Sequence, residues 1–249
     1  MLHKAGVMDS DTTGLGLPLN QTLGRNLTHG MLDTLGKAIV VGRYETRPFP
    51  TEAEIAKTFG VSRSVTREAV KMLTAKGLVS ARPRQGTVVQ PSSQWNLFDA
   101  DVLRWLLDRK FSVQLLRQFN QLRIAIEPEA AALAALHHSA EELAAIQDGL
   151  HRMERADAGD GDPLEADIAF HVAVLRASGN PFYAQFQQMV ATALRTSIRF
   201  TNRIKGRTAS IADHAAVADA IAARDVTVSR MAMQRIIGDV LGLIGDAED

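Results

Sequence analysis

Residues 49–91 constrain the fold of this chain more than any other segment. They contain two short runs of apolar residues at helical spacing, a tight turn between the runs, and a basic hairpin after them. Thr51 begins the first run and Glu54 follows three residues later, which is the spacing of a capping box. Gly60 is placed to end this helix in the left-handed conformation. We therefore expect a helix-turn-helix followed by a two-stranded wing.

The second run has one apolar face and one cationic face. Ser62 or Ser64 can cap its N-terminus, and Gly77 follows its last turn. A helix that buries one side and exposes Arg, Ser and Lys on the other suits the major groove of DNA, where N-terminal residues reach base edges. The candidate DNA-contacting residues on this helix and at its cap are Ser62, Arg63, Ser64, Arg67 and Lys71.

The hairpin after this helix has a cationic tip. Residues 79–81 and 87–89 are predicted to be its two short strands. Arg82, Arg84 and Gly86 lie between them and are further candidates for DNA contact, to phosphates or in the minor groove. The alternative is a helical hairpin with a solvated basic face. The order of caps, turn, cationic helix and wing favours the DNA-binding interpretation.

Composition indicates two domains and no membrane partner. A chain of 249 residues is long enough for two domains, and the absence of cysteine excludes disulfides and thiolate metal sites. No apolar run approaches the roughly 20 residues that a membrane span needs. The N-terminus lacks the features of a signal peptide, so we expect a cytoplasmic protein. The predicted parts are a tail at 1–21, a winged helix-turn-helix at 22–91, a linker at 92–101 and a second domain at 102–249.

The zero net charge conceals an asymmetry between these parts. Residues 22–91 carry eleven Lys and Arg against five Asp and Glu, whereas residues 92–249 carry sixteen against twenty-one. This division is typical of a cationic DNA reader joined to an acidic second domain. Because the cationic part is modest in charge, we expect a homodimer that binds a palindromic operator on double-stranded DNA.

The second domain has helical periodicity throughout and no strand pattern. The expected helices include one capped by Ser139, one that begins at Pro163, one over residues 181–201 and one capped by Ser210. The predicted fold is therefore mainly α, with an N-terminal winged helix-turn-helix and a C-terminal antiparallel all-α helical bundle.

A polar pocket is predicted inside this bundle. Asp167 and His171 are four residues apart and share a helix face, and His214 lies on the buried stripe of another helix. If the three converge, they can hold a divalent metal of the Zn, Ni or Mn type. The alternative is a core histidine bonded to Asp167. Arg123 and Glu127 are also four apart, either as a surface ion pair or as part of a site in which Arg123 grips an anionic ligand.

The segment 49–91 resembles the winged-helix domain of the GntR superfamily. The matching motifs, in order along the chain, are FPTE, IA, GVSR, VTREAV, KGLV and RQGTVV. The resemblance implies that Arg63, Arg67 and Gly86 touch DNA. Ala53 stands where some members have a basic residue, so one family contact is missing here.

The second half resembles the FCD ligand-binding domain of FadR-type GntR regulators. The resemblance implies metal ligation by Asp167, His171 and His214, and a fourth ligand near Ile236, where this chain has no histidine. At most three ligands then come from the protein. The candidate effector-binding residues are Arg123, Glu127, Asn180 and Arg199.

Residues 94–105 are similar to the segment that follows the wing in regulators of galactonate catabolism. We therefore expect a ligand-responsive repressor of sugar-acid catabolism genes, released from DNA by a small organic acid such as a hexonate. One alternative is the same class of regulator with another carboxylate effector, such as a dicarboxylate or an amino acid. The other is a metalloenzyme, which is disfavoured because the chain has no HExxH motif, nucleophile elbow or Gly-rich phosphate loop.

Overall fold

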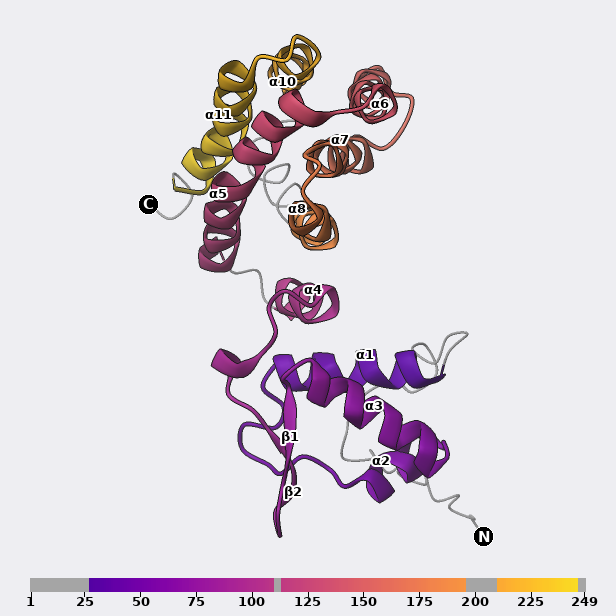
Figure 1. The fold of residues 1–249 in the computed structure, drawn as a ribbon. Helices are drawn as coiled ribbons and strands as arrows, with labels where there is room; N and C mark the ends of the chain where they lie inside the picture. Colours follow the sequence, from indigo (N-terminus) through magenta and orange to yellow (C-terminus); the bar gives the residue numbers. More distant parts are fainter. Residues whose placement is uncertain (1–26, 110–112, 196–209, 246–249) are drawn as a thin grey trace, which may run out of the picture. The chain divides into compact units, whose positions relative to one another are not determined.

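The computed structural model describes residues 27–109, 113–195 and 210–245 (Figure 1). The chain forms two compact units, Met1–Leu97 and Phe98–Asp249. The division falls inside the segment 92–101 that the sequence predicts to be a linker. No helix among the described residues has both the length and the apolar character needed to span a membrane.

The first unit is a three-helix domain with a β-hairpin. Its elements are α1 (Leu27–Val40), α2 (Glu52–Phe59), α3 (Arg63–Ala75), β1 (Val79–Arg82) and β2 (Gly86–Val89). Both α1 and α2 pack against α3, and β1 follows α3 onto the same core. The two strands are antiparallel, in a register that runs from Val79 opposite Val89 to Arg82 opposite Gly86. The predicted winged helix-turn-helix is confirmed, with each strand one residue longer than expected. The most deeply buried side chains of this core are Met31, Leu32, Leu35, Ile55, Leu73 and Leu78.

The predicted caps define the turn between α2 and α3. Thr51 and Glu54 form both halves of the capping box, and Gly60 ends α2 with a φ of 65°. Ser62 begins α3, where its side chain accepts a hydrogen bond from the backbone N–H of Val65. These caps place the N-terminus of α3 in one orientation, with its first side chains facing solvent.

The segment after the wing folds back onto the end of α3. Gly77 has a φ of 75°, and a Cβ atom there would collide with the backbone carbonyl of Gln94. The backbone N–H of Asn96 donates to the carbonyl of Lys76 at 3.0 Å. Trp95 donates from its Nε1 to the carbonyl of Gln90 at 2.9 Å. The chain is therefore tied to the base of α3 as far as residue 96.

The second unit is helical throughout its described residues, as the sequence predicts. Its helix α5 packs against α7, α10 and α11, and α6 packs against α7 and α10 (Figure 1). One core lies among these five helices, and a second one joins α4, α5, α7 and residues 189–194. The named elements are α4 (Ala100–Arg109), α5 (Val113–His137), α6 (Ala140–Asp157), α7 (Pro163–Ala177), α8 (Pro181–Gln185), α10 (Ile211–Ala222) and α11 (Val226–Gly245).

The expectation of one continuous helix over residues 181–201 is wrong. Helix α8 ends at Gln185, and the helical residues 187–195 follow after a turn. The N–H of Phe186 bonds to the carbonyl of Tyr183, three residues back, so the α-helical pattern is interrupted there. The carbonyl of Phe186 then accepts the N–H of Val190 and begins the next helical run.

Helices α6 and α7 approach each other closely at Gly149. A Cβ atom at this position would lie 2.9 Å from the Cα atom of Phe170, which is closer than real Cβ contacts come. Phe170 is fully buried and immediately precedes His171 on α7. The absence of a side chain at Gly149 thus sets the position of the part of α7 that carries the polar candidates.

We predict opposite effects for two Gly→Ala substitutions in helices of this unit. Gly149→Ala should lower the free energy of unfolding by about 1–3 kcal/mol, because the added methyl group forces α6 and α7 apart. Gly238→Ala is the matched control, since no atom lies within 4 Å of its added methyl group. It should raise the free energy of unfolding by about 0.5–1 kcal/mol, because alanine favours the helix. Urea unfolding followed by circular dichroism measures both, and equal effects would contradict the close-packing argument.

Candidate functional site

The candidate DNA-contacting residues lie on the exposed side of α3 and at the tip of the wing. Arg63, Ser64, Arg67 and Lys71 are all exposed, while Ala69, Val70 and Leu73 of the same helix are buried. Arg67 lies 3.7 Å from a carboxylate oxygen of Glu52, and both side chains remain open to solvent. Exposed pairs of this kind contribute about 1 kcal/mol or less, so phosphate can replace the carboxylate at little cost.

The wing tip is a tight turn that presents two arginines. The backbone N–H of Gln85 donates to the carbonyl of Arg82 at 3.2 Å, with Pro83 and Arg84 between them. Arg84 has a φ of 65°, which is unfavourable for a residue with a side chain, and Gly86 has a φ of 78°. Pro83 and this left-handed position are typical of a type II turn. The turn leaves Arg82 and Arg84 exposed.

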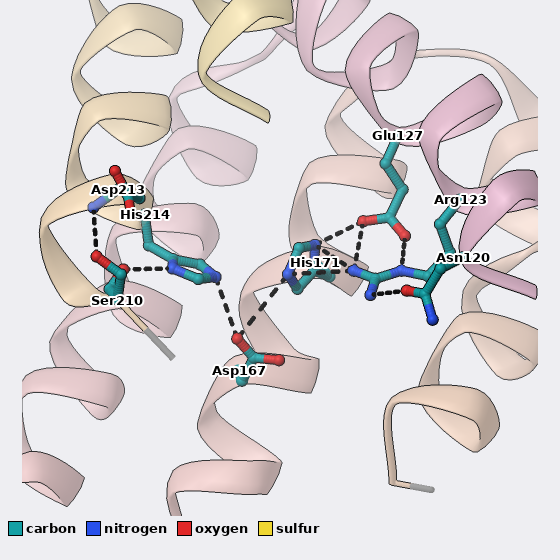
Figure 2. Close-up of polar contacts among 8 residues, drawn as sticks. All are labelled: Asn120, Arg123, Glu127, Asp167, His171, Ser210, Asp213 and His214. Carbon is teal, nitrogen blue, oxygen red and sulfur yellow. Dashed lines mark hydrogen bonds and ion pairs between the residues drawn. The ribbon is translucent and has the colours of Figure 1, made fainter. Parts of the chain in front are cut away.

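A buried polar cluster lies inside the second unit, as Figure 2 shows. Helix α5 contributes Asn120, Arg123 and Glu127, helix α7 contributes Asp167 and His171, and helix α10 contributes His214. All six side chains are buried. The sequence predicted five of them. Asn120 was missed, although its position three residues before Arg123 places it on the same helix face.

Arg123 and Glu127 form a buried ion pair, so the surface alternative is wrong. Nε of Arg123 lies 2.5 Å from Oε1 of Glu127, and Nη2 lies 3.2 Å from Oε2. Nη1 of Arg123 donates to Oδ1 of Asn120 at 3.2 Å. Burial raises the pKa of Glu127, but the charge of Arg123 and the contact with His171 outweigh it and lower this pKa to about 2. Glu127 is therefore an ionised carboxylate in the folded protein.

His171 is held from one side by Glu127. Its Nδ1 lies 2.6 Å from Oε2 of Glu127, and because a carboxylate only accepts, Nδ1 carries the proton. In the neutral ring Nε2 is then the unprotonated nitrogen, and Nη2 of Arg123 lies 3.4 Å from it. Nε2 lies 3.9 Å from Oδ1 of Asp167, the side chain four residues earlier on α7.

His214 is held through its Nδ1 atom by a backbone carbonyl. Its Nδ1 lies 2.7 Å from the carbonyl oxygen of Ser210, so Nδ1 again carries the proton. Its Nε2 lies 3.1 Å from Oδ1 of Asp167 but makes no hydrogen bond of acceptable geometry, and it is shielded from solvent. The neutral ring thus points a lone pair at a carboxylate, which is unfavourable unless a cation or a proton lies between them.

When both imidazoles are neutral, the cluster contains one more negative than positive charge. Burial raises the pKa of Asp167, but the close approach of His214 and the charges around it lower this pKa below its usual range overall. With neutral imidazoles, the two carboxylates of Glu127 and Asp167 face a single guanidinium from Arg123. No other Asp, Glu, Lys or Arg is buried among the described residues of this unit. A buried uncompensated charge is costly, so the site favours a cation.

Three of these side chains offer metal ligands close together. One ligand atom from each of Asp167, His171 and His214 lies within 4.8 Å of the other two. A carboxylate oxygen with two imidazole nitrogens is a common donor set for zinc and other first-row divalent metals. The residue at the position expected for a fourth ligand, Ile236, packs against the apolar core of this unit. The three candidate ligands are therefore compatible with a metal that has one or more coordination positions not filled by the protein.

The remaining candidate among the described residues, Asn180, is not in this cluster. Asn180 caps α8, where its side-chain oxygen accepts the N–H of Phe182 at 2.9 Å. Arg199 lies outside the described residues.

Two families and several individual proteins match this chain. Residues 32–89 match the family "Bacterial regulatory proteins, gntR family", and residues 118–239 match the FCD domain. The chain is 34% identical over 224 residues to the uncharacterized HTH-type transcriptional regulator YieP of Escherichia coli K12, with 86% of this chain and 93% of that protein covered. It is 32% identical over 215 residues to the galactonate operon transcriptional repressor of the same organism, with 85% and 94% covered.

The solved structure of E. coli McbR/YncC is similar in fold. The TM-score is 0.50 at 18% sequence identity, with 90% of this chain and 99% of that chain covered. Two regulator domains occur in order along the sequence, and both of the relatives above are regulators rather than enzymes. The chain therefore belongs to the GntR family of bacterial transcription regulators, in the FadR-type group that carries a C-terminal FCD domain.

Proposed function

We propose that this regulator represses genes of sugar-acid catabolism and leaves its DNA when a small organic acid binds to the second unit. The relative that represses the galactonate operon supports this assignment, because the match extends over both domains. The interior of the second unit also favours a polar effector. Its buried carboxylates, imidazoles and guanidinium suit the hydroxyl and carboxylate groups of a hexonate better than a long acyl chain.

The proposed DNA reader is α3 together with the wing. In this proposal the exposed residues at the start of α3 enter the major groove, and Arg82, Arg84 and Gly86 contact the backbone or the minor groove. We also propose that the regulator is a homodimer on a palindromic operator. The net charge of +6 over residues 22–91 supports this, because two copies double the number of phosphate contacts.

We further propose that Asp167, His171 and His214 bind a divalent metal. The observation that carries this proposal is the buried Nε2 of His214, which faces Asp167 without an acceptable hydrogen bond. A metal ion in this position would accept both imidazole lone pairs and balance the excess negative charge. When bound, it would supply a positive centre that attracts the oxygens of an organic anion. The alternative is a second proton on His214, which would make an ion pair with Asp167 and need no metal.

The switch requires an effector that prefers one conformation of the dimer. A ligand that binds two conformations equally well shifts neither, however tightly it binds. In the repressor proposal the effector favours the conformation with the lower affinity for the operator. Arg123, Glu127, Asn180 and Arg199 remain the candidates from this chain for contact with that effector.

The DNA-reading proposal is tested by Arg63→Ala and Arg67→Ala. Each should weaken binding to a duplex selected by the wild-type protein from a random-sequence library. A lost base contact costs about 1–3 kcal/mol, or roughly fivefold to more than a hundredfold in affinity. Arg155→Ala removes an exposed arginine from α6 instead and should leave the affinity unchanged at the same salt concentration. Gel-shift titration measures all three, and wild-type affinity in the α3 variants would refute this role for α3.

The metal proposal is tested by loading purified protein with Ni²⁺ or Zn²⁺ and measuring the bound metal after dialysis. The wild-type protein should retain one ion per chain, whereas His171→Ala and His214→Ala should retain none. His151→Ala is the control, because His151 is an exposed histidine on α6. Elemental analysis gives the ratio. A wild-type protein that retains no metal would contradict the proposal and favour the doubly protonated His214.

The effector class is tested by a thermal-shift screen of hexonates, hexuronates, dicarboxylates and amino acids, with and without divalent metal. A hexonate should raise the melting temperature and also dissociate the protein from its selected duplex, since the effector binds the folded protein. A dicarboxylate or an amino acid that does both, with no response to hexonates, would replace the sugar-acid assignment by the alternative effector class.

A further inference from the structure

Glu127 lies at the centre of the buried cluster, yet it is not among the three clustered metal-ligand candidates. Both of its carboxylate oxygens are engaged. Oε1 contacts Nε of Arg123 at 2.5 Å, and Oε2 contacts both Nη2 of Arg123 at 3.2 Å and Nδ1 of His171 at 2.6 Å. Figure 2 shows this carboxylate in contact with both the guanidinium and the imidazole, which also lie beside each other. Glu127 therefore connects α5 to α7 at the ring of His171.

The contact with Glu127 determines which nitrogen of His171 can bind a cation. A carboxylate has no proton to donate, so the 2.6 Å contact places the proton of the ring on Nδ1. Nε2 is then the unprotonated nitrogen, 3.9 Å from Oδ1 of Asp167 and 3.4 Å from Nη2 of Arg123. A carboxylate partner on the opposite nitrogen also makes an imidazole a stronger metal ligand.

The two histidines differ in what holds them. His214 donates to the backbone carbonyl of Ser210, a neutral group that no side-chain substitution removes. His171 instead depends on one side chain, Glu127, which is ionised and buried. Loss of Glu127 should therefore affect His171 and leave the orientation of His214 intact.

Arg123 completes this arrangement from the other side. Two of its nitrogens contact Glu127 and the third donates to Asn120, whose own amide donates to the carbonyl of Leu116 at 2.9 Å. One edge of the planar guanidinium thus forms a bidentate ion pair with the carboxylate. These contacts balance the negative charge of Glu127 and fix the position of its side chain.

We propose that Glu127 is a positioning residue for the metal centre, and that Arg123 holds Glu127 in place. Glu127 selects the tautomer of His171 in which Nε2 is the ligand atom. This inference rests on the proposed metal function, but the tautomer of His171 can be measured without any metal. The two proposals can therefore fail separately.

The first measurement is metal affinity of the full chain, by competition with a chromophoric chelator for Co²⁺ and Zn²⁺. Glu127→Gln keeps the size of the side chain but removes its charge, and it should weaken binding about 10–100-fold. Glu127→Asp, which restores the charge on a shorter side chain, should recover part of the loss. Glu129→Gln is the matched control, because Glu129 lies on the same helix in an exposed pair with Arg230. It should leave the affinity within twofold of wild type.

The second measurement is the protonation pattern of His171 in metal-free protein, by nitrogen-15 NMR of the histidine rings. The wild-type protein should carry its proton on Nδ1. The double variant Arg123→Met/Glu127→Met removes both members of the ion pair and leaves the net charge of the cluster unchanged, so it should fold. In this variant His171 should lose its preference for one tautomer, while His214 should keep its proton on Nδ1.

These outcomes separate the two proposals. A wild-type protein that binds no metal but has the Nδ1 tautomer at His171, lost in the double variant, would refute the metal centre and retain the positioning role. A wild-type protein that binds metal, with Glu127→Gln within twofold of its affinity, would overturn the inference. A proton on Nε2 of His171 in the metal-free wild type would overturn it as well.

Discussion

The polar interior of the second unit depends on how two buried carboxylates, Glu127 and Asp167, are balanced by neighbouring groups. Glu127 has a guanidinium and an imidazole proton beside it, whereas Asp167 faces two imidazole nitrogens that carry no proton when the rings are neutral. Removing a carboxylate from water is costly unless its charge is balanced. The surrounding helices bring these groups together in spite of that cost. This unbalanced charge is the reason for proposing a metal at the polar cluster.

The helices around the cluster are arranged so that three separate segments meet there. Helix α5 carries the Arg–Glu pair, α7 carries Asp167 and His171 on one face, and α10 carries His214. Gly149 lets α6 come close to the backbone of α7 at Phe170, one residue before His171. The ring of Phe170 in turn makes T-shaped contacts with both histidine rings, with centroids 5.9 and 5.0 Å away. The apolar packing thus limits the movement of both histidine rings.

The sequence was most informative where local spacing determines geometry. The capping boxes at Thr51 and Ser139, the glycine at the end of α2 and the two-stranded wing all depend on residues within a few positions of each other. Spacing also predicted that Asp167 and His171 share a face. It could not show that His214 would meet them, because that contact depends on how α7 and α10 pack. For the same reason, spacing could not distinguish a surface pair from a buried one at Arg123, since both have four-residue spacing.

The break after α8 shows a second limit of sequence patterns. The apolar residues on both sides of Phe186 continue at helical spacing, so nothing in the pattern marks the point where hydrogen bonding changes. The missed Asn120 is different. Its spacing was visible, but a lone asparagine on a helix is usually solvated, and only the burial of its neighbours gives it a role.

The attachment of residues 90–96 to the base of α3 has an evolutionary consequence. Asn96 is hydrogen-bonded to Lys76, and Gly77 closely approaches Gln94. The end of α3 and the beginning of the linker therefore pack together as one structural unit. The first unit therefore includes the residues that anchor the start of the linker to α3. Recombination that joins a different sensor domain beyond residue 96 would leave α3 and its supports intact. A DNA-binding domain built in this way can be inherited as a unit and combined with sensors for unrelated metabolites.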